Sequence, residues 1–87
     1  MLRISEMSQS GEGTALKLEG ELMGPWVSEV KKACEPFLSN DNLLTLDFAD
    51  VSLVDRAGIA LLKELKHARV RLVNCSPFLT EQLKTEN

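Results

Sequence analysis

The spacing of apolar residues changes along the chain, and each change predicts a new element of secondary structure. Near the N-terminus, Leu2 and Ile4 alternate with polar residues, and Leu16 and Leu18 do the same after a turn-rich segment at residues 8–13. Such alternation is typical of strands that place one face on a core. The first part of the chain is therefore predicted to be an antiparallel hairpin.

A helical spacing follows the hairpin. Val27, Val30 and Cys34 recur every three or four residues, which places them on one side of a helix. Pro25 precedes them and suits the first helical position, where a missing N–H costs nothing. Pro36 is expected to bend or end the helix in its last turn. These residues predict a first helix that begins at Pro25.

The middle of the chain contains an apolar run, an acidic turn and an amphipathic run. Residues 43–48 are too few for a helix and too continuously apolar for a strand with one wet face, so they predict a buried central strand. The amphipathic run then shows helical spacing at Ile59, Leu62 and Leu65. Asp55 is placed to cap this helix, with residues 56–58 in its first turn. This strand, loop and helix are expected to form the centre of the fold.

The last part of the chain predicts a strand and a short helix. Val70, Leu72 and Val73 indicate the strand, and Ser76 followed by Pro77 gives an N-cap and a first helical residue. The resulting order is β-β-α-β-α-β-α, in a single domain that spans residues 1–87. Strands separated by helices pair in parallel, so the expected fold is α/β: a small mixed sheet with helices packed mainly on one face.

Charge and composition limit the function classes. The net charge of −3 over 87 residues argues against a nucleic-acid partner, which would call for a basic face. No apolar stretch approaches the length of a membrane span, so direct membrane insertion is not expected and the chain is predicted to be cytoplasmic. Cys34 and Cys75 lie among apolar neighbours and are predicted to be small buried hydrophobes in a reducing compartment.

The sequence carries no recognisable catalytic or metal-binding constellation. His67 is the single histidine and lies near a helix end, where a solvated side chain interacts favourably with the helix dipole. Neither cysteine belongs to a pair with the spacing of metal ligands. No nucleophile triad, zinc-helix motif or phosphate-binding glycine loop is found. The prediction is a non-enzymatic protein without a cofactor or a metal.

Residues 47–62, DFADVSLVDRAGIALL, resemble the signature of STAS domains, the sulfate-transporter and anti-sigma-factor-antagonist family. In that signature a strand ends in Asp, and a hydrophobic turn, Asp-Ser-Ser/Ala-Gly-Leu and a helix follow. Residues 20–22 before the first helix and residues 74–77 before the last helix also fall where the family has similar features. The resemblance implies a STAS fold and a single-domain binding module like an anti-sigma-factor antagonist, used in regulation of transcription by partner switching.

In that family a partner that combines a serine kinase with an anti-sigma factor phosphorylates the serine after the motif Asp. Arg56 occupies this position here, so the phosphorylation site is degenerate. The resemblance therefore implies docking of a kinase-like regulator without that phosphorylation. The expected partner-binding residues are Asp50, Ser52, Asp55, Arg56, Ala57 and Gly58.

The sequence leaves several alternatives open. The chain could instead be a peripheral STAS-like subunit of a membrane transport assembly for lipids or anions, or, less readily in so small a domain, a small-ligand sensor. Self-association into a homodimer stays open, and Ser52 and Ser28 are hydroxyls that could replace the missing serine. Trp26 either packs on the sheet edge or anchors a partner.

Arg56 itself has three interpretations. An arginine in the first turn of a helix is unfavourable by about 0.3–1 kcal/mol unless an anion offsets it. The first interpretation is a local ion pair with Asp50 or Asp55. The second is a partner's carboxylate or a phosphate held by Arg56 and the helix N–H groups. The third is drift at a site that has lost its role.

Overall fold

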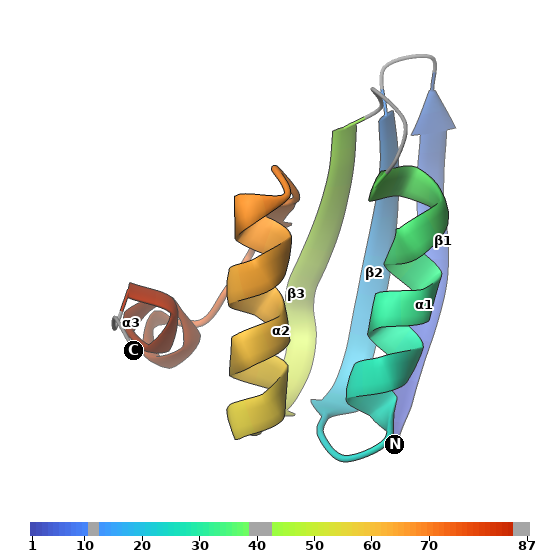
Figure 1. Cartoon of the computed structure of the whole chain (residues 1–87). Coiled ribbons are helices and arrows are strands. Elements are labelled where there is room, and N and C mark those ends of the chain that lie inside the picture. Colours follow the sequence, from blue (N-terminus) through green and yellow to red (C-terminus); the bar gives the residue numbers. More distant parts are fainter. Residues whose placement is uncertain (11–12, 39–42, 85–87) are drawn as a thin grey trace.

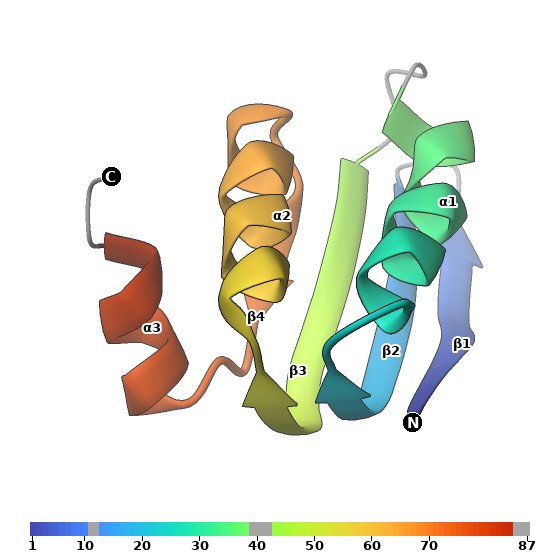
Figure 2. The same ribbon diagram turned by 60° about the horizontal axis from the view of Figure 1, so that its bottom comes forward.

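The computed structural model describes residues 1–10, 13–38 and 43–84, and its elements follow the predicted order. The described residues form four strands and three helices, whose arrangement Figures 1 and 2 show. Their bounds are β1 (Leu2–Ser10), β2 (Gly13–Leu22), α1 (Trp26–Leu38), β3 (Leu43–Val54), α2 (Arg56–His67), β4 (Arg71–Val73) and α3 (Pro77–Lys84). Part of the predicted hairpin connection and the turn residues before β3 lie outside the described residues, at 11–12 and 39–42.

The strands form one mixed sheet in the order β1-β2-β3-β4. β1 pairs with β2 in antiparallel fashion, with Ile4 opposite Leu18, which confirms the predicted hairpin. β2 pairs with β3 in parallel, and β3 pairs with β4 in parallel from Thr45 to Asp47. The carboxyl ends of β2 and β3 therefore lie at the same edge of the sheet, where the loop before α2 begins.

The helices lie on one side of the sheet, as predicted. α1 and α2 cover one face, and α3 lies beside α2 (Figures 1 and 2). The core between these layers is almost entirely aliphatic and includes Leu16, Leu18, Leu22, Val30, Leu44, Leu46, Phe48, Leu61, Leu62 and Leu65. The α/β fold class predicted from the sequence is thus confirmed.

The prediction that residues 43–48 are buried on both faces is wrong. Leu44, Leu46 and Phe48 are buried, whereas Leu43 is exposed and Asp47 is half-buried. The physical reason is that helices cover only one face, so β3 has a neighbour on each side in the sheet but still presents alternate side chains to solvent. From Leu44 to Phe48 the strand alternates between buried and partly exposed residues. The apolar Leu43 before them made this alternation look like a continuous apolar run.

The helix boundaries differ from the prediction only in α1. This helix begins at Trp26, so Pro25 lies just before it, and it continues through Pro36 to Leu38. The capping predictions are confirmed for the other two helices: Asp55 caps α2, and the Ser76 hydroxyl accepts a hydrogen bond from the Leu79 N–H at 3.1 Å at the start of α3.

The two cysteines have different surroundings. Cys34 is fully buried, and this burial raises the pKa of its thiol to about 11, so the thiol stays protonated. Cys75 is only half-buried, and desolvation raises its pKa as well. The prediction of a buried residue is therefore confirmed for Cys34 and only in part for Cys75. None of the described helices is long and apolar enough to span a bilayer.

Candidate functional site

Asp55 fixes the loop between β3 and α2 to its surroundings through both carboxylate oxygens. Oδ1 accepts a hydrogen bond from the Gly58 N–H at 2.8 Å, which caps α2. Oδ2 accepts one from the Gly24 N–H at 3.0 Å, in the turn between β2 and α1. Gly24 has a φ of 58°, a conformation that side-chain-bearing residues rarely adopt. One carboxylate therefore joins the turns that precede the two main helices.

These hydrogen bonds also set the charge state of Asp55. The N–H groups of Gly24 and Gly58, in that order of importance, hold the pKa of the Asp55 carboxyl below its ordinary value of 3.8. The carboxylate is thus ionised at neutral pH, and each of its oxygens already has a donor within the chain. Asp55 holds the site in place.

Gly58 allows α2 to approach the sheet closely. A Cβ atom at this position would lie 2.7 Å from Val54 Cγ1 and 3.0 Å from the backbone oxygen of Leu22. Gly58 is itself buried, within the first turn of α2. A small residue is therefore needed here for packing.

Arg56 and Ala57 are the exposed members of the first turn of α2. The predicted ion pair between Arg56 and Asp50 or Asp55 is not formed among the described residues. Asp50 instead forms an ion pair with Lys17, in which Lys17 Nζ and Asp50 Oδ2 are 2.8 Å apart. The carboxylate oxygens of Asp55 accept hydrogen bonds from backbone N–H groups. The strand pairing explains this difference, because Asp50 lies within β3 opposite Glu19 of β2, next to Lys17 and before the end of the strand from which α2 begins. The guanidinium of Arg56 faces solvent.

The six residues expected to bind a partner are thus brought together only in part. Residues 55–58 are contiguous at the start of α2, whereas Asp50 belongs to the Lys17 pair. Ser52 is exposed, and its hydroxyl donates a hydrogen bond to the backbone oxygen of Gly20 at 3.3 Å. Trp26 is half-buried and packs against the core, and Ser28 is exposed on α1.

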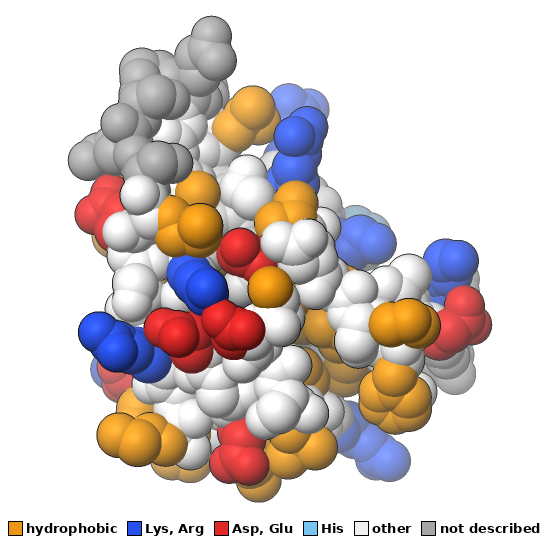
Figure 3. All heavy atoms as spheres, turned by 180° about the vertical axis from the view of Figure 1, so that it is seen from behind, with side chains coloured by type: hydrophobic (Ala, Val, Ile, Leu, Met, Phe, Trp, Pro, Cys, Tyr) orange, Lys and Arg blue, Asp and Glu red, His pale blue; other side chains and the backbone are white. Residues whose placement is uncertain are grey.

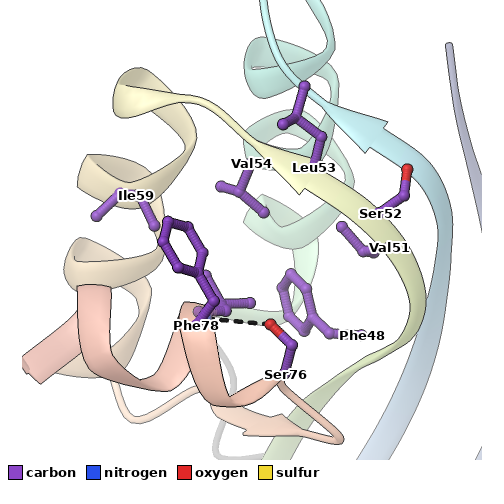
Figure 4. Close-up of a pocket in the computed structure, with 9 residues that line it drawn as sticks. Phe48, Val51, Ser52, Leu53, Val54, Ile59, Ser76 and Phe78 are labelled. Carbon is purple, nitrogen blue, oxygen red and sulfur yellow. Dashed lines mark hydrogen bonds between the residues drawn. The ribbon is translucent and has the colours of Figure 1, made fainter.

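An apolar groove that was not predicted from the sequence lies beside this loop. Phe78 is 72% exposed and Leu53 is 47% exposed, although both are large apolar residues. They border a hollow between β3, α2 and α3 with a volume of about 80 Å³. The residues that line it, shown in Figure 4, are Phe48, Val51, Ser52, Leu53, Val54, Ile59, Ser76, Phe78 and Leu79. We refer to this surface as the apolar groove.

The groove continues into a second, more open hollow at the start of α2. This depression has a volume of about 450 Å³, and its lining includes Arg56, Lys63 and Gln82 together with Phe78. The sequence signal that could have indicated the groove is the pair Phe78-Leu79, because adjacent residues on a helix point about 100° apart, so a short helix that packs through one of them can leave the other exposed. Leu79 takes that place and is 5% exposed.

A metal centre finds no support within residues 1–10, 13–38 and 43–84. No group of three His, Cys, Asp or Glu side chains in this part of the chain could hold an ion. The arrangement at the start of α2 offers an exposed cation, an apolar surface and a rigid backbone. These features are suited to recognition, and nothing in them provides a nucleophile with its base.

Comparison with known proteins identifies relatives of this arrangement. Residues 5–84 match the family model described as Mlab, STAS domain. The anti-sigma factor antagonist SpoIIAA, in its unphosphorylated form, superposes with a TM-score of 0.75 at 18% identity, covering 91% of this chain and 79% of its own. An anti-sigma-factor antagonist STAS domain from Rhodobacter sphaeroides superposes with a TM-score of 0.60 at 16% identity, covering 84% of this chain and 86% of its own. None of the curated proteins matches the sequence.

Proposed function

The chain belongs to the STAS-domain family, and we propose that it is a non-enzymatic docking module that binds a kinase-like regulator through the start of α2. The family is generally non-enzymatic, and its anti-sigma-factor antagonists bind other proteins as regulatory modules. The contact surface comprises the exposed Arg56 and Ala57, held in place by Asp55 and Gly58. The proposed location of this interaction is the cytoplasm.

The observation that carries this proposal is the state of Arg56. Its guanidinium is exposed in the first turn of α2 and makes no ion pair within the described part of the chain. A cation at the positive end of a helix dipole is unfavourable in isolation. A carboxylate from a partner would remove this penalty, and charge pairs of this kind give interfaces their specificity.

Docking is proposed to occur without phosphorylation at this position. Arginine has no hydroxyl, and its charge is opposite to that of a phosphoserine. The hydroxyl of Ser52 lies on β3 and donates to the Gly20 carbonyl, so it is not at the start of α2. The module would therefore bind its partner without this covalent control.

The same residue favours a second candidate function. A docking site without a phosphorylatable hydroxyl suits a permanent contact better than a switched one. A peripheral subunit of a membrane transport assembly needs such a permanent contact. The two candidates differ in the partner they recover: a kinase-like regulator supports the first, and a transporter subunit supports the second.

The experiment is a titration with the natural partner. Tagged chain is used to isolate this partner from its own cells, and calorimetry then compares the wild type with Arg56→Glu. We expect Arg56→Glu to weaken binding by about 1 kcal/mol or more, because it places like charges at the contact.

Arg71→Glu is the matched control. It makes the same change in net charge on β4, away from the start of α2, and is expected to leave the affinity unchanged. Equal affinities for the wild type and Arg56→Glu would remove Arg56 from the interface and would contradict the proposal.

A further inference from the structure

The apolar groove exposes large apolar side chains to solvent. Phe78 lies on the first turn of α3 and Leu53 near the end of β3, and both border the same hollow. Scattered exposed apolar residues are ordinary, whereas a contiguous apolar surface beside a hollow is typical of a binding site. Figure 3 shows the molecule from behind, and hydrophobic side chains are exposed in the region of α3, on the right of this view.

The shape of the hollow limits its occupant. Its volume is about 80 Å³, well below the range of roughly 300–1,000 Å³ that is usual for small-molecule sites. In Figure 4 the ring of Phe78 lies toward Ile59 and Val54, whereas the ring of Phe48 lies inside the curve of β3 and is buried. This geometry fits one aliphatic side chain that enters from solvent and contacts Phe78.

The charge next to the hollow specifies the chemistry of the rest of the occupant. Arg56 and Lys63 line the adjoining depression, and the only carboxylate among its lining residues belongs to Asp55. The oxygens of Asp55 accept hydrogen bonds from backbone N–H groups. Arg56, which has no counter-ion in the described part of the chain, therefore places a positive charge at the rim of the groove, and this charge is complementary to an acidic side chain.

We propose that the apolar groove binds an acidic, amphipathic peptide segment of the partner, with one aliphatic side chain in the hollow and a carboxylate on Arg56. This inference rests on the proposed docking function and deepens it, because it identifies the part of the partner that is recognised. It also extends the contact surface from the start of α2 to β3 and α3. Phe78 is its central apolar contact.

A random-peptide phage library provides a probe that does not require the natural partner. The full chain is immobilised, and the library is depleted first on Phe78→Ala so that peptides bound elsewhere are removed. We expect the enriched peptides to combine an aliphatic residue with Asp or Glu a few positions away. Enrichment of basic peptides, or no enrichment over Phe78→Ala, would overturn the proposal.

The best peptide is then titrated against purified variants by fluorescence anisotropy. Phe78→Ala and Arg56→Gln are each expected to weaken binding by about tenfold, because central contacts dominate such interfaces. Leu43→Ala is the matched control, since Leu43 is 55% exposed but lies at the other end of β3. It is expected to change the affinity by less than about twofold. Unchanged melting temperatures exclude unfolding as the cause.

The natural partner separates this inference from the proposed function. Loss of binding for Arg56→Glu with full binding for Phe78→Ala would refute the groove and leave docking at α2 intact. Full binding for both variants would refute both proposals. Sedimentation of the chain alone tests a different occupant: a dimer that Phe78→Ala converts to a monomer would assign the groove to a second copy and overturn the peptide proposal.

Discussion

The open face of the sheet and the apolar groove are both exposed, but their side chains are arranged differently. On the open face Lys17 forms an ion pair with Asp50, and the Asp47 carboxylate accepts hydrogen bonds from the Asn74 side chain and the Ala49 N–H. Charged side chains of both signs lie next to each other near the middle of this face (Figure 3). These polar side chains of the open face therefore have partners within the chain.

The groove shows the opposite arrangement. Phe78 and Leu53 expose apolar surface, and Arg56 has no counter-ion in the described part of the chain. Only its supporting residue, Asp55, has both of its oxygens hydrogen-bonded. Exposure alone therefore does not identify a docking surface. Exposed groups that have no partner in the described part of the chain identify such a surface more reliably.

The largest effect on stability is expected for Gly58→Val, because a branched side chain would collide with Val54 and with the Leu22 carbonyl. We expect a loss of about 2 kcal/mol in the free energy of unfolding, measured by urea denaturation. Ala49→Val is the control on β3, where residue 49 is exposed, and it should change the stability by less than about 0.5 kcal/mol. Equal losses for both variants would show that the packing around Gly58, below the docking site, is no closer than the packing around Ala49 on the open face.

A smaller effect is expected for Asp55→Ala, which removes the acceptors of the Gly24 and Gly58 N–H groups. We expect the melting temperature to fall by about 5 °C, measured by circular dichroism. Asp50→Ala, which removes only the exposed ion pair with Lys17, should lower it by about 1 °C or less. A larger fall for Asp50→Ala would reverse the contrast between the two regions.

The smallest effect is expected in the pH dependence of stability. The folded-state pKa of Asp55 lies below the ordinary value of 3.8, because the carboxylate accepts hydrogen bonds from Gly24 and Gly58. Its contribution is therefore fully present above the unfolded-state pKa and is lost as the pH falls below that value toward the folded-state pKa. Asp55→Asn keeps a capping oxygen but does not titrate, so its stability should decline less steeply below about pH 4.

Asp47 on the open face provides the comparison for that measurement. Hydrogen bonds from Asn74 and then from the Ala49 N–H lower its pKa as well, so Asp47→Asn should flatten the acid limb in the same direction. An acid limb that is unchanged in both variants would show that neither carboxylate is held in its charged form by the fold.

Much of the fold could be predicted because its signals are local. The capping side chains of Asp55 and Ser76 predict where α2 and α3 begin. The alternation of strands with helices predicts that the strands pair in parallel. The exposed face of β3 could not be predicted, because an apolar run does not show which of its sides a helix will cover. That depends on where α1 and α2 pack.

The candidate site was predictable only as a stretch of sequence. Its position at the start of α2 followed from the Asp55 cap, but the sequence does not show that Asp50 forms an ion pair with Lys17 on the neighbouring strand and leaves Arg56 without one among the described residues. The groove depends on how α3 lies against α2, and only the tertiary structure shows that Phe78 remains outside. Sequence patterns identify which residues are apolar, and packing decides which of them stay exposed.

The unequal lengths of β3 and β4 have a consequence for the architecture of this surface. β4 runs only from Arg71 to Val73 and pairs with β3 at Thr45 to Asp47, whereas β3 continues to Val54. Beyond Asp47, the flank of β3 that faces away from β2 has no strand beside it in the described part of the chain. A few more residues in β4 would cover that flank of β3 through backbone hydrogen bonds. Because β4 is short, the flank stays accessible to a segment of a partner chain.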